Sequence, residues 1–239
     1  MPTGNHENNA KHFMRILHND QSLIAVEKPS GLLVHRSRLA KDSNTVKEIV
    51  EESMKIDNRL YSVHRLDRGT SGVLIFAKTQ KSAAHLSAQF RENKIKKKYW
   101  AIARGYTPWS DKISRPVRDH RNRQIDTADT IYRTLGRREF PHPVGPYSTA
   151  RYSWVEIMPV TGRYHQIRQH FHSISHPIIG DTVHGDGKHN RFFREHLKIE
   201  RLCLICKEIE FTHPETEERI RVQSSHKSAH IFKLAHFIE

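Results

Sequence analysis

The sequence predicts an α+β domain with a large, mostly antiparallel mixed sheet flanked by helices and loops. Segments of strand character outnumber segments of helical periodicity, and the two kinds do not alternate strictly along the chain. The 239 residues can bury one sizeable core, and no internal repeat or low-complexity block divides them. We therefore expect a loose polar tail over residues 1–12 and a single domain over residues 13–239.

The first strand signals surround a turn. An apolar run at 23–26 is followed by the turn sequence KPSG at 28–31, and apolar residues resume at 32–34, so we expect strand, turn and strand. The stretch TVKEIVEES then predicts a short helix with an apolar face. The run GVLIFA at 72–77 is typical of a buried strand.

A second helix and a long strand are expected next. Thr79 is suited to cap a helix on which Ala83, Leu86 and Phe90 share one face. The stretch KIKKKYWAIARGY changes from a basic run into a strand that carries Tyr99. Residues 107–146 are rich in Arg, Asp, Pro and Gly, and we expect long surface loops there around a short strand at 130–132. The arginines of this region suit phosphate binding and a solvated loop face equally well.

The last third of the chain predicts a strand, a helix and a strand pair. TARYSWVEIMPV has strand character, and TGRYHQIRQHFHSISHP predicts a helix capped by Thr161 and ended before Pro177. LCLICKEIEFTHP and RIRVQ read as paired strands with HPETEE as their turn. The apolar stripe of the helix consists of Tyr164, Ile167, Phe171 and Ile174.

Charge and cysteine content restrict the partners and the compartment. The chain has 40 Lys and Arg against 26 Asp and Glu, a formal charge of +14, which favours a polyanionic partner, nucleic acid first and an anionic membrane second. No apolar stretch is long enough to span a membrane or to act as a secretory signal, so we expect a cytoplasmic protein. Cys203 and Cys206 form an isolated C-x-x-C whose members should point to opposite faces of a strand, as structural filler.

Several kinds of chemistry are disfavoured by the motifs that are missing. No glycine-rich turn opens a helix with the spacing of phosphate or dinucleotide sites, and no G-x-S-x-G surrounds Ser71. His165 and His170 diverge on a helix and no H-E-x-x-H occurs, so we expect no metal site and no cofactor.

One carboxylate stands out from this background. In VHRLDRGTSG, Asp67 lies between Arg65 and Arg68, directly before a buried strand, and nearby cations favour the ionised form that a nucleophile or base requires. Arg168, at the edge of the apolar stripe of its helix, requires an anionic partner. From residue types alone, Asp67 suits catalysis and the anchoring of a strand-entry turn equally well.

Four ordered segments resemble one enzyme family. HRLDRGTSG is similar to the catalytic motif HRLD-x-x-TSG of the RluA-type pseudouridine synthases, and VEKPSGLLVH resembles the first motif of that family. KKKYWAIARG resembles its tyrosine-bearing strand, and TGRYHQIRQH with HPIIGD resembles its third motif and the loop after it. The resemblance covers residues 16 to 222. LLVHRS, PYSTARYSWVEIMPVTGRYHQIR and HPIIGDTVHGDGKHNR are most similar to the TruC branch, which isomerises uridine 65 of tRNA.

The resemblance implies a pseudouridine-synthase-like domain that acts on RNA without a cofactor. Because few residues precede the first motif, we expect no separate N-terminal RNA-binding domain, and we expect a monomer. Asp67 matches the catalytic aspartate, and Arg65 matches the arginine that enters the RNA in place of the flipped nucleotide. Tyr99 matches the tyrosine that packs on the extruded base, and Ile167 and Arg168 match an apolar wall and the partner of the aspartate. The alternatives are the same chemistry on ribosomal RNA and a catalytically silent RNA chaperone.

Overall fold

A ten-stranded sheet forms the centre of the computed structural model, which describes residues 14–36, 44–56, 59–119, 121, 123–225 and 230–237. The strands are β1 (Ile16–Asn19), β2 (Leu23–Lys28), β3 (Tyr61–Ser62), β4 (Ser71–Ala77), β5 (Lys96–Arg104), β6 (Ser110–Arg118), β7 (Gln124–Phe140), β8 (Ala150–Pro159), β9 (Leu204–Thr212) and β10 (Arg219–Gln223). The helices are α1 (Val46–Ser53), α2 (Gln80–Arg91), α3 (Gln166–Ser173), α4 (Gly187–Leu197) and α5 (His230–Leu234). Residues 1–12, expected to form a tail, lie outside the described residues.

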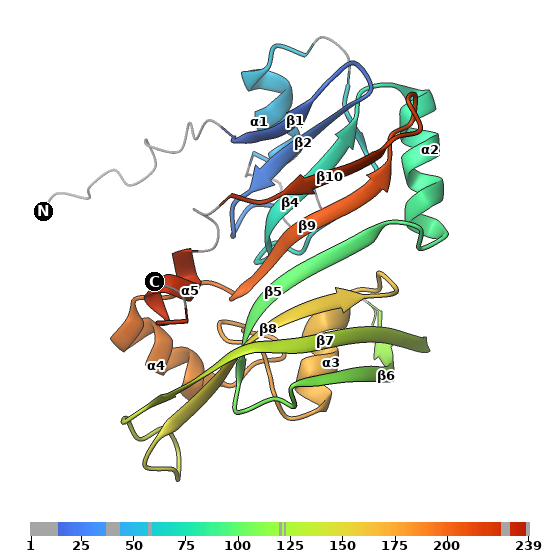
Figure 1. Cartoon of the computed structure of the whole chain (residues 1–239). Coiled ribbons are helices and arrows are strands. Elements are labelled where there is room, and N and C mark those ends of the chain that lie inside the picture. The colour runs from blue at the N-terminus through green and yellow to red at the C-terminus, as the bar shows by residue number, and fades with distance from the viewer. Residues whose placement is uncertain are drawn as a thin grey trace, which may run out of the picture.

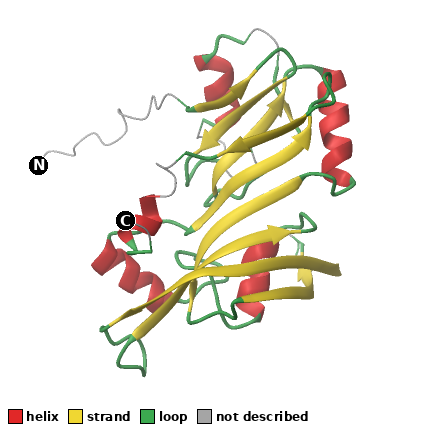
Figure 2. Ribbon diagram, viewed as in Figure 1, coloured by secondary structure: helices red, strands yellow, loops and turns green. Residues whose placement is uncertain are grey.

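The strand order is β1-β2-β4-β9-β5-β8-β7-β6 (Figure 1). In addition, β10 pairs with β9 and β3 pairs with β4. Among the described pairings, β4 and β9 are parallel and the others are antiparallel. The predicted α+β class with a mostly antiparallel mixed sheet is therefore confirmed. Figure 2 shows how few helices accompany the strands.

The parallel junction is where β4 begins, directly after the segment that carries Asp67. All seven residues of β4 are buried, as the run GVLIFA predicted. Gly72 pairs with Cys206 at φ +108°, and a Cβ at this position would lie 2.1 Å from the carbonyl oxygen of Cys206. Only glycine allows the backbones of β4 and β9 to approach so closely, so this contact fixes the start of β4 against β9.

Alternating side chains of β5 divide the core of this half of the sheet between two faces. Ala101 and Ala103 pack in the apolar cluster under α3, together with Ile167 and Phe171. Ile102, one position away, packs in the cluster that contains residues of α4 and α5. The sheet thus carries α3 on one face and α4 with α5 on the other.

The predicted helices are present, with one correction. Thr45 forms a capping box at α1, and Thr79 caps α2 by accepting a hydrogen bond from the Ser82 N–H. Thr161 does not cap α3, which begins only at Gln166 after a left-handed residue, His165. The Thr161 hydroxyl instead donates to the side-chain oxygen of Gln166. The motif around Asp67 thus faces a bend rather than the regular first turn of a helix.

Two strand predictions were wrong. Residues 32–34 do not form a strand, because the carbonyls of Leu33 and Val34 accept hydrogen bonds from the first N–H groups of α1. Residues 107–146 were expected to be loops around a short strand, yet they contain β6 and the 17-residue β7. Apart from Tyr132, the buried residues of these strands are small or β-branched, and many of their exposed residues are charged, so their composition resembles that of a loop.

The strand pair at the end of the chain and the cysteines follow the prediction. β9 and β10 pair in antiparallel register. Cys203 and Cys206 are free and buried, and they lie in different apolar clusters, as strand filler does. Burial raises the pKa of each thiol to about 12. No helix among the described residues is long and apolar enough to cross a membrane.

Candidate active site

The loop before β4 holds Asp67 in one place. The ammonium group of Lys28, which is fully buried, donates to the carbonyls of Pro29, Arg68 and Thr70 at 3.0, 3.0 and 2.8 Å. The Thr70 N–H donates to the Asp67 carbonyl at 3.0 Å. Burial lowers the pKa of Lys28 to about 7. The Lys28 side chain thus hydrogen-bonds three carbonyls from two loops, which fixes the backbone around Asp67.

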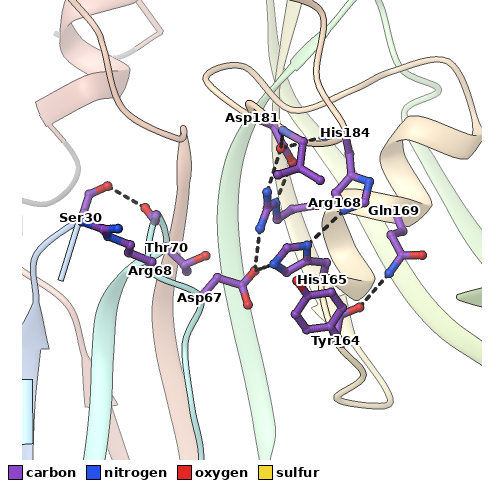
Figure 3. A network of polar contacts seen from close by, with 12 residues as sticks. Ser30, Asp67, Arg68, Thr70, Tyr164, His165, Arg168, Gln169, Asp181 and His184 are labelled. Atoms are coloured by element: carbon purple, nitrogen blue, oxygen red, sulfur yellow. Dashed lines mark hydrogen bonds and ion pairs between the residues drawn. The ribbon is translucent and has the colours of Figure 1, made fainter. Parts of the chain in front are cut away.

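Arg168 joins this loop to a second carboxylate. Its Nη1 lies 3.2 Å from Oδ2 of Asp67, and its Nε and Nη2 donate to the two oxygens of Asp181 at 2.7 and 2.8 Å (Figure 3). Burial alone would raise the pKa of Asp181, but hydrogen bonds from Arg168 and from the backbone N–H of His184 lower it. The predicted pairing of Arg168 with Asp67 is present, and the tighter bidentate pair is made with Asp181.

The carboxylate of Asp67 uses only one of its two oxygens. Oδ2 contacts Arg168 and lies 3.8 Å from Nε2 of His165. Within the part of the chain that the structure describes, Oδ1 has no hydrogen-bond partner, and the side chain is 20% exposed. An ionised carboxylate has about four acceptor sites, so this group keeps capacity for a bound substrate.

Two histidines extend the network away from Asp67. His165 has φ 49° and ψ 22°, its ring stacks on Tyr164 at 3.8 Å, and its Nδ1 lies 3.1 Å from Nε2 of His184 (Figure 3). Burial lowers the pKa of His165 to about 4, although the nearby Asp67 opposes this effect. His165 is therefore neutral at physiological pH and held in a left-handed conformation that non-glycine residues adopt at a cost.

A cavity of about 540 Å³ opens over the carboxylate. The side chains predicted as site residues all line it: Arg65, Asp67, Tyr99, Ile167 and Arg168. Its size is that of a small-molecule pocket and is sufficient for one nucleoside. Lys97, Arg91 and Arg163 add positive charge around it. Residues more than 100 positions apart in the sequence thus meet at one concave site.

The individual side chains differ in their exposure. Arg65 is exposed, whereas Tyr99 is half-buried on β5 and Ile167 is buried on α3. Burial holds the pKa of Tyr99 well above its ordinary value, so its phenol stays neutral. The site therefore combines an exposed cation, a neutral aromatic ring and an apolar wall around one carboxylate.

Sequence reasoning missed Asp181, His165 and His184. Asp181 lies in HPIIGD, a segment noted for its resemblance but given no role. A second carboxylate could have been sought because a buried guanidinium such as that of Arg168 requires anionic partners. His165 was read as part of a regular helix. No group of three or more metal-ligating side chains with metal-binding geometry occurs among the described residues.

Comparison with known proteins identifies the family. Residues 22–173 match the model of the RNA pseudouridylate synthase family. The tRNA pseudouridine synthase C of Vibrio cholerae is 38% identical over 224 aligned positions, which cover 89% of this chain and 91% of the relative. The protein of the same name from Haemophilus ducreyi is 39% identical over 218 positions, covering 87% and 89%.

Two solved structures share the fold. Human RNA Pseudouridylate Synthase Domain Containing 4 superposes with a TM-score of 0.69 at 23% identity and covers 93% of each chain. Human RNA Pseudouridylate Synthase Domain Containing 1 superposes with a TM-score of 0.70 at 21% identity, over 92% of this chain and 86% of the other. With a family model that spans most of the chain and relatives that match over nearly their whole length, the chain belongs to the RNA pseudouridylate synthase family.

Proposed function

We propose that the protein isomerises a uridine of tRNA to pseudouridine, and that this uridine is the one at position 65. The observation that carries the proposal is the carboxylate of Asp67, which has one oxygen held by Arg168 and the other open to a cavity of nucleoside size. Relatives named tRNA pseudouridine synthase C support the choice of tRNA. The position follows from the resemblance to the TruC branch.

The reaction is an internal rearrangement and consumes no second substrate. The bond between ring nitrogen 1 and the sugar breaks, the base rotates, and a bond from carbon 5 to the same sugar carbon forms. Carbon 5 loses a proton and nitrogen 1 gains one, so the atoms balance without oxidant, reductant or cofactor. The protein has to supply a fixed reactive group, a place for the base and a way to hold the base while it turns.

In the proposed mechanism Asp67 is the catalytic group, acting through Oδ1. Arg168 is a positioning residue: it holds and orients the Asp67 carboxylate, and Asp181 in turn fixes the guanidinium. The target uridine has to leave the base stack to reach Asp67. Arg65, exposed at the cavity, enters the RNA in its place, while Tyr99 packs on the extruded base and Ile167 forms the apolar wall.

The surroundings of the site support an RNA substrate. The formal charge of the chain is +14, and one lysine and four arginines line the cavity, which suits the phosphates around a flipped nucleotide. We place the protein in the cytoplasm, where tRNA is processed and thiols stay reduced. We propose that it works there as a monomer on RNA, away from membranes.

The substrate is tested by mapping pseudouridines in total RNA from cells that lack this protein. We expect pseudouridine 65 to disappear from tRNA and to return when the wild-type gene is supplied. Loss of a ribosomal site in place of the tRNA site would overturn the choice of substrate. An unchanged map would overturn the enzyme assignment and favour an RNA-binding protein without activity.

A further inference from the structure

A rigid surface of aromatic rings and arginines lies outside the catalytic cavity. Tyr106 and Trp109 come from the connection between β5 and β6, Arg137 from β7 and Arg151 from β8. We call these four residues the aromatic surface. Trp109 is 62% exposed and Tyr106 is 37% exposed. Tyr and Trp are enriched at interaction sites because each combines a large apolar ring with a polar group.

Guanidinium groups stack on both rings. The Arg137 guanidinium carbon lies 4.3 Å from the centre of the Trp109 ring and 5.3 Å from that of Tyr106. Arg151 lies 5.4 Å from the Tyr106 ring. These contacts orient the rings while most of the Trp109 side chain stays in solvent.

The backbone that carries the rings is held by buried hydrogen bonds. The N–H of Thr107, a fully buried residue, donates to the Ser153 hydroxyl at 3.0 Å, and its carbonyl accepts from Arg137 at 2.5 Å. The Thr134 N–H donates to the Trp109 carbonyl at 2.8 Å. Trp109 is thus presented by a preorganised segment, which lowers the entropy lost when a partner binds.

The aromatic surface and the cavity lie on the same face of the sheet. Along β8, Arg151 and Ser153 alternate in phase with Val155 and Ile157, which pack under α3. Arg137 pairs with Ser153 across the strands and shares that face. The N–H of Gly105, directly before Tyr106, donates to the Arg151 carbonyl at 2.7 Å, and the N–H of Arg104 donates to the carbonyl of Pro177, four residues past α3, so the surface begins near the end of this helix. The helix has eight residues, about 12 Å of length, and its other end is at Asp67.

The charges favour RNA as the occupant. Arg151 is partly neutralised by Glu139 at 3.2 Å, whereas Arg137 has no carboxylate within ion-pair distance in the part of the chain that is described. A cation beside an exposed ring matches a nucleotide, whose base presents a π-face and whose phosphate presents a charge.

We propose that the aromatic surface binds an unpaired nucleotide of the substrate RNA, with its base stacked on Trp109 and its phosphate beside Arg137. This inference rests on the proposed RNA substrate and adds a second contact, separate from the flipped uridine. Because every base has a π-face, the contact supplies affinity and orientation, not recognition of one base.

Binding of bulk tRNA to three variants tests the proposal. Trp109→Ala should raise both Kd and KM about tenfold, since stacking of one base is worth on the order of 1–3 kcal/mol. Trp109→Phe keeps a stacking ring and should stay within about threefold of wild type. Tyr147→Ala is the matched control, because Tyr147 is 70% exposed and lies on the β7–β8 turn, outside the aromatic surface. We expect it to bind as the wild type does.

Tryptophan fluorescence gives a second readout. Trp100 and Trp154 contact each other at 5.0 Å in the cluster on the opposite face, so only Trp109 should be quenched by tRNA or by a single-stranded oligouridylate. Trp109→Phe should abolish the quenching. Equal quenching in this variant, or a Kd of Trp109→Ala within twofold of wild type, would overturn the inference and indicate a partner other than RNA. Pseudouridine formation by the wild type is measured separately, so failure of the proposed function is distinguished from failure of this contact.

Discussion

Asp20 and Asp67 are two carboxylates in similar settings with different hydrogen bonding. Each lies in a turn next to a strand of the same sheet, each has histidine within 4 Å, and their side chains are 30% and 20% exposed. Asp20 accepts the Ser22 and Leu23 N–H groups on Oδ1, while Oδ2 contacts His18 and His213. Among the described residues, Asp67 has contacts on Oδ2 alone.

The difference shows which property separates an anchoring carboxylate from a reactive one. Burial alone would raise the pKa of Asp20, but hydrogen bonds from His18 and from the backbone lower it to about 2. Both oxygens of Asp20 are occupied by these contacts, and the contact with His213 joins the β1–β2 turn to the β9–β10 turn. Exposure does not distinguish the two groups, since Asp67 is the less exposed. The two groups differ in that Asp67 has an unoccupied carboxylate oxygen and lines a cavity.

The largest change in stability is expected from Arg168→Ala. This variant leaves Asp181, whose side chain is fully buried, without its counter-charge, and we expect the free energy of unfolding to fall by about 3–5 kcal/mol, with loss of activity. Arg123→Ala, which breaks a surface pair with Asp119, is the control and should cost less than about 1 kcal/mol. Urea unfolding measures both. Equal stability of the Arg168 variant and wild type would contradict the account of the ion-pair network.

Asp20→Asn should cost less and spare catalysis. The pKa of Asp20 is lowered in the folded state, so its stabilisation is present above about pH 4 and is lost as the pH falls through about 2. After allowance for its partial exposure, we expect a loss of about 1–2 kcal/mol at pH 7, which shrinks towards pH 2. Urea unfolding at pH 7 and pH 2.5 tests this. A fall in kcat as large as the one expected for Asp67 variants would remove the distinction between the two groups.

The smallest effect is expected from His165→Asn and is read from the pH dependence of the free energy of unfolding. Folded His165 stays neutral with a pKa of about 4, whereas the unfolded residue gains a proton below about pH 6.5, so acid destabilises the wild type between these values. Asparagine tolerates the left-handed backbone and does not titrate. The variant should therefore lose less stability than wild type between pH 6.5 and pH 4. Parallel pH profiles of the variant and the wild type would contradict the claim that folded His165 stays neutral in this range.

Local patterns in the sequence were sufficient for part of this picture. The buried run of β4, the helix α1 and the cap of α2 could be predicted from local patterns, because an apolar period leaves few alternatives, and the pairing of Arg168 with Asp67 followed from the family resemblance. β6 and β7 could not, since their hydrogen bonds are made with other strands and their exposed faces are as polar as loops.

The same reason explains the missed site residues. Asp181 lies in an irregular segment after Gly180, which has φ +77°, and only the tertiary fold brings it to Arg168. His165 is the bend that delays α3 to Gln166, and its left-handed conformation is set by the contacts around it. Which oxygen of Asp67 stays unoccupied is a fact of three-dimensional packing alone.

The central claim, that the open oxygen of Asp67 performs the chemistry, is tested most directly by the rate of pseudouridine formation on bulk tRNA with Asp67→Asn. We predict a loss of about 1,000-fold or more, with tRNA binding within about threefold of wild type, while Asp20→Asn in the same assay keeps the wild-type rate. Pseudouridine formation at the wild-type rate by Asp67→Asn would contradict the claim.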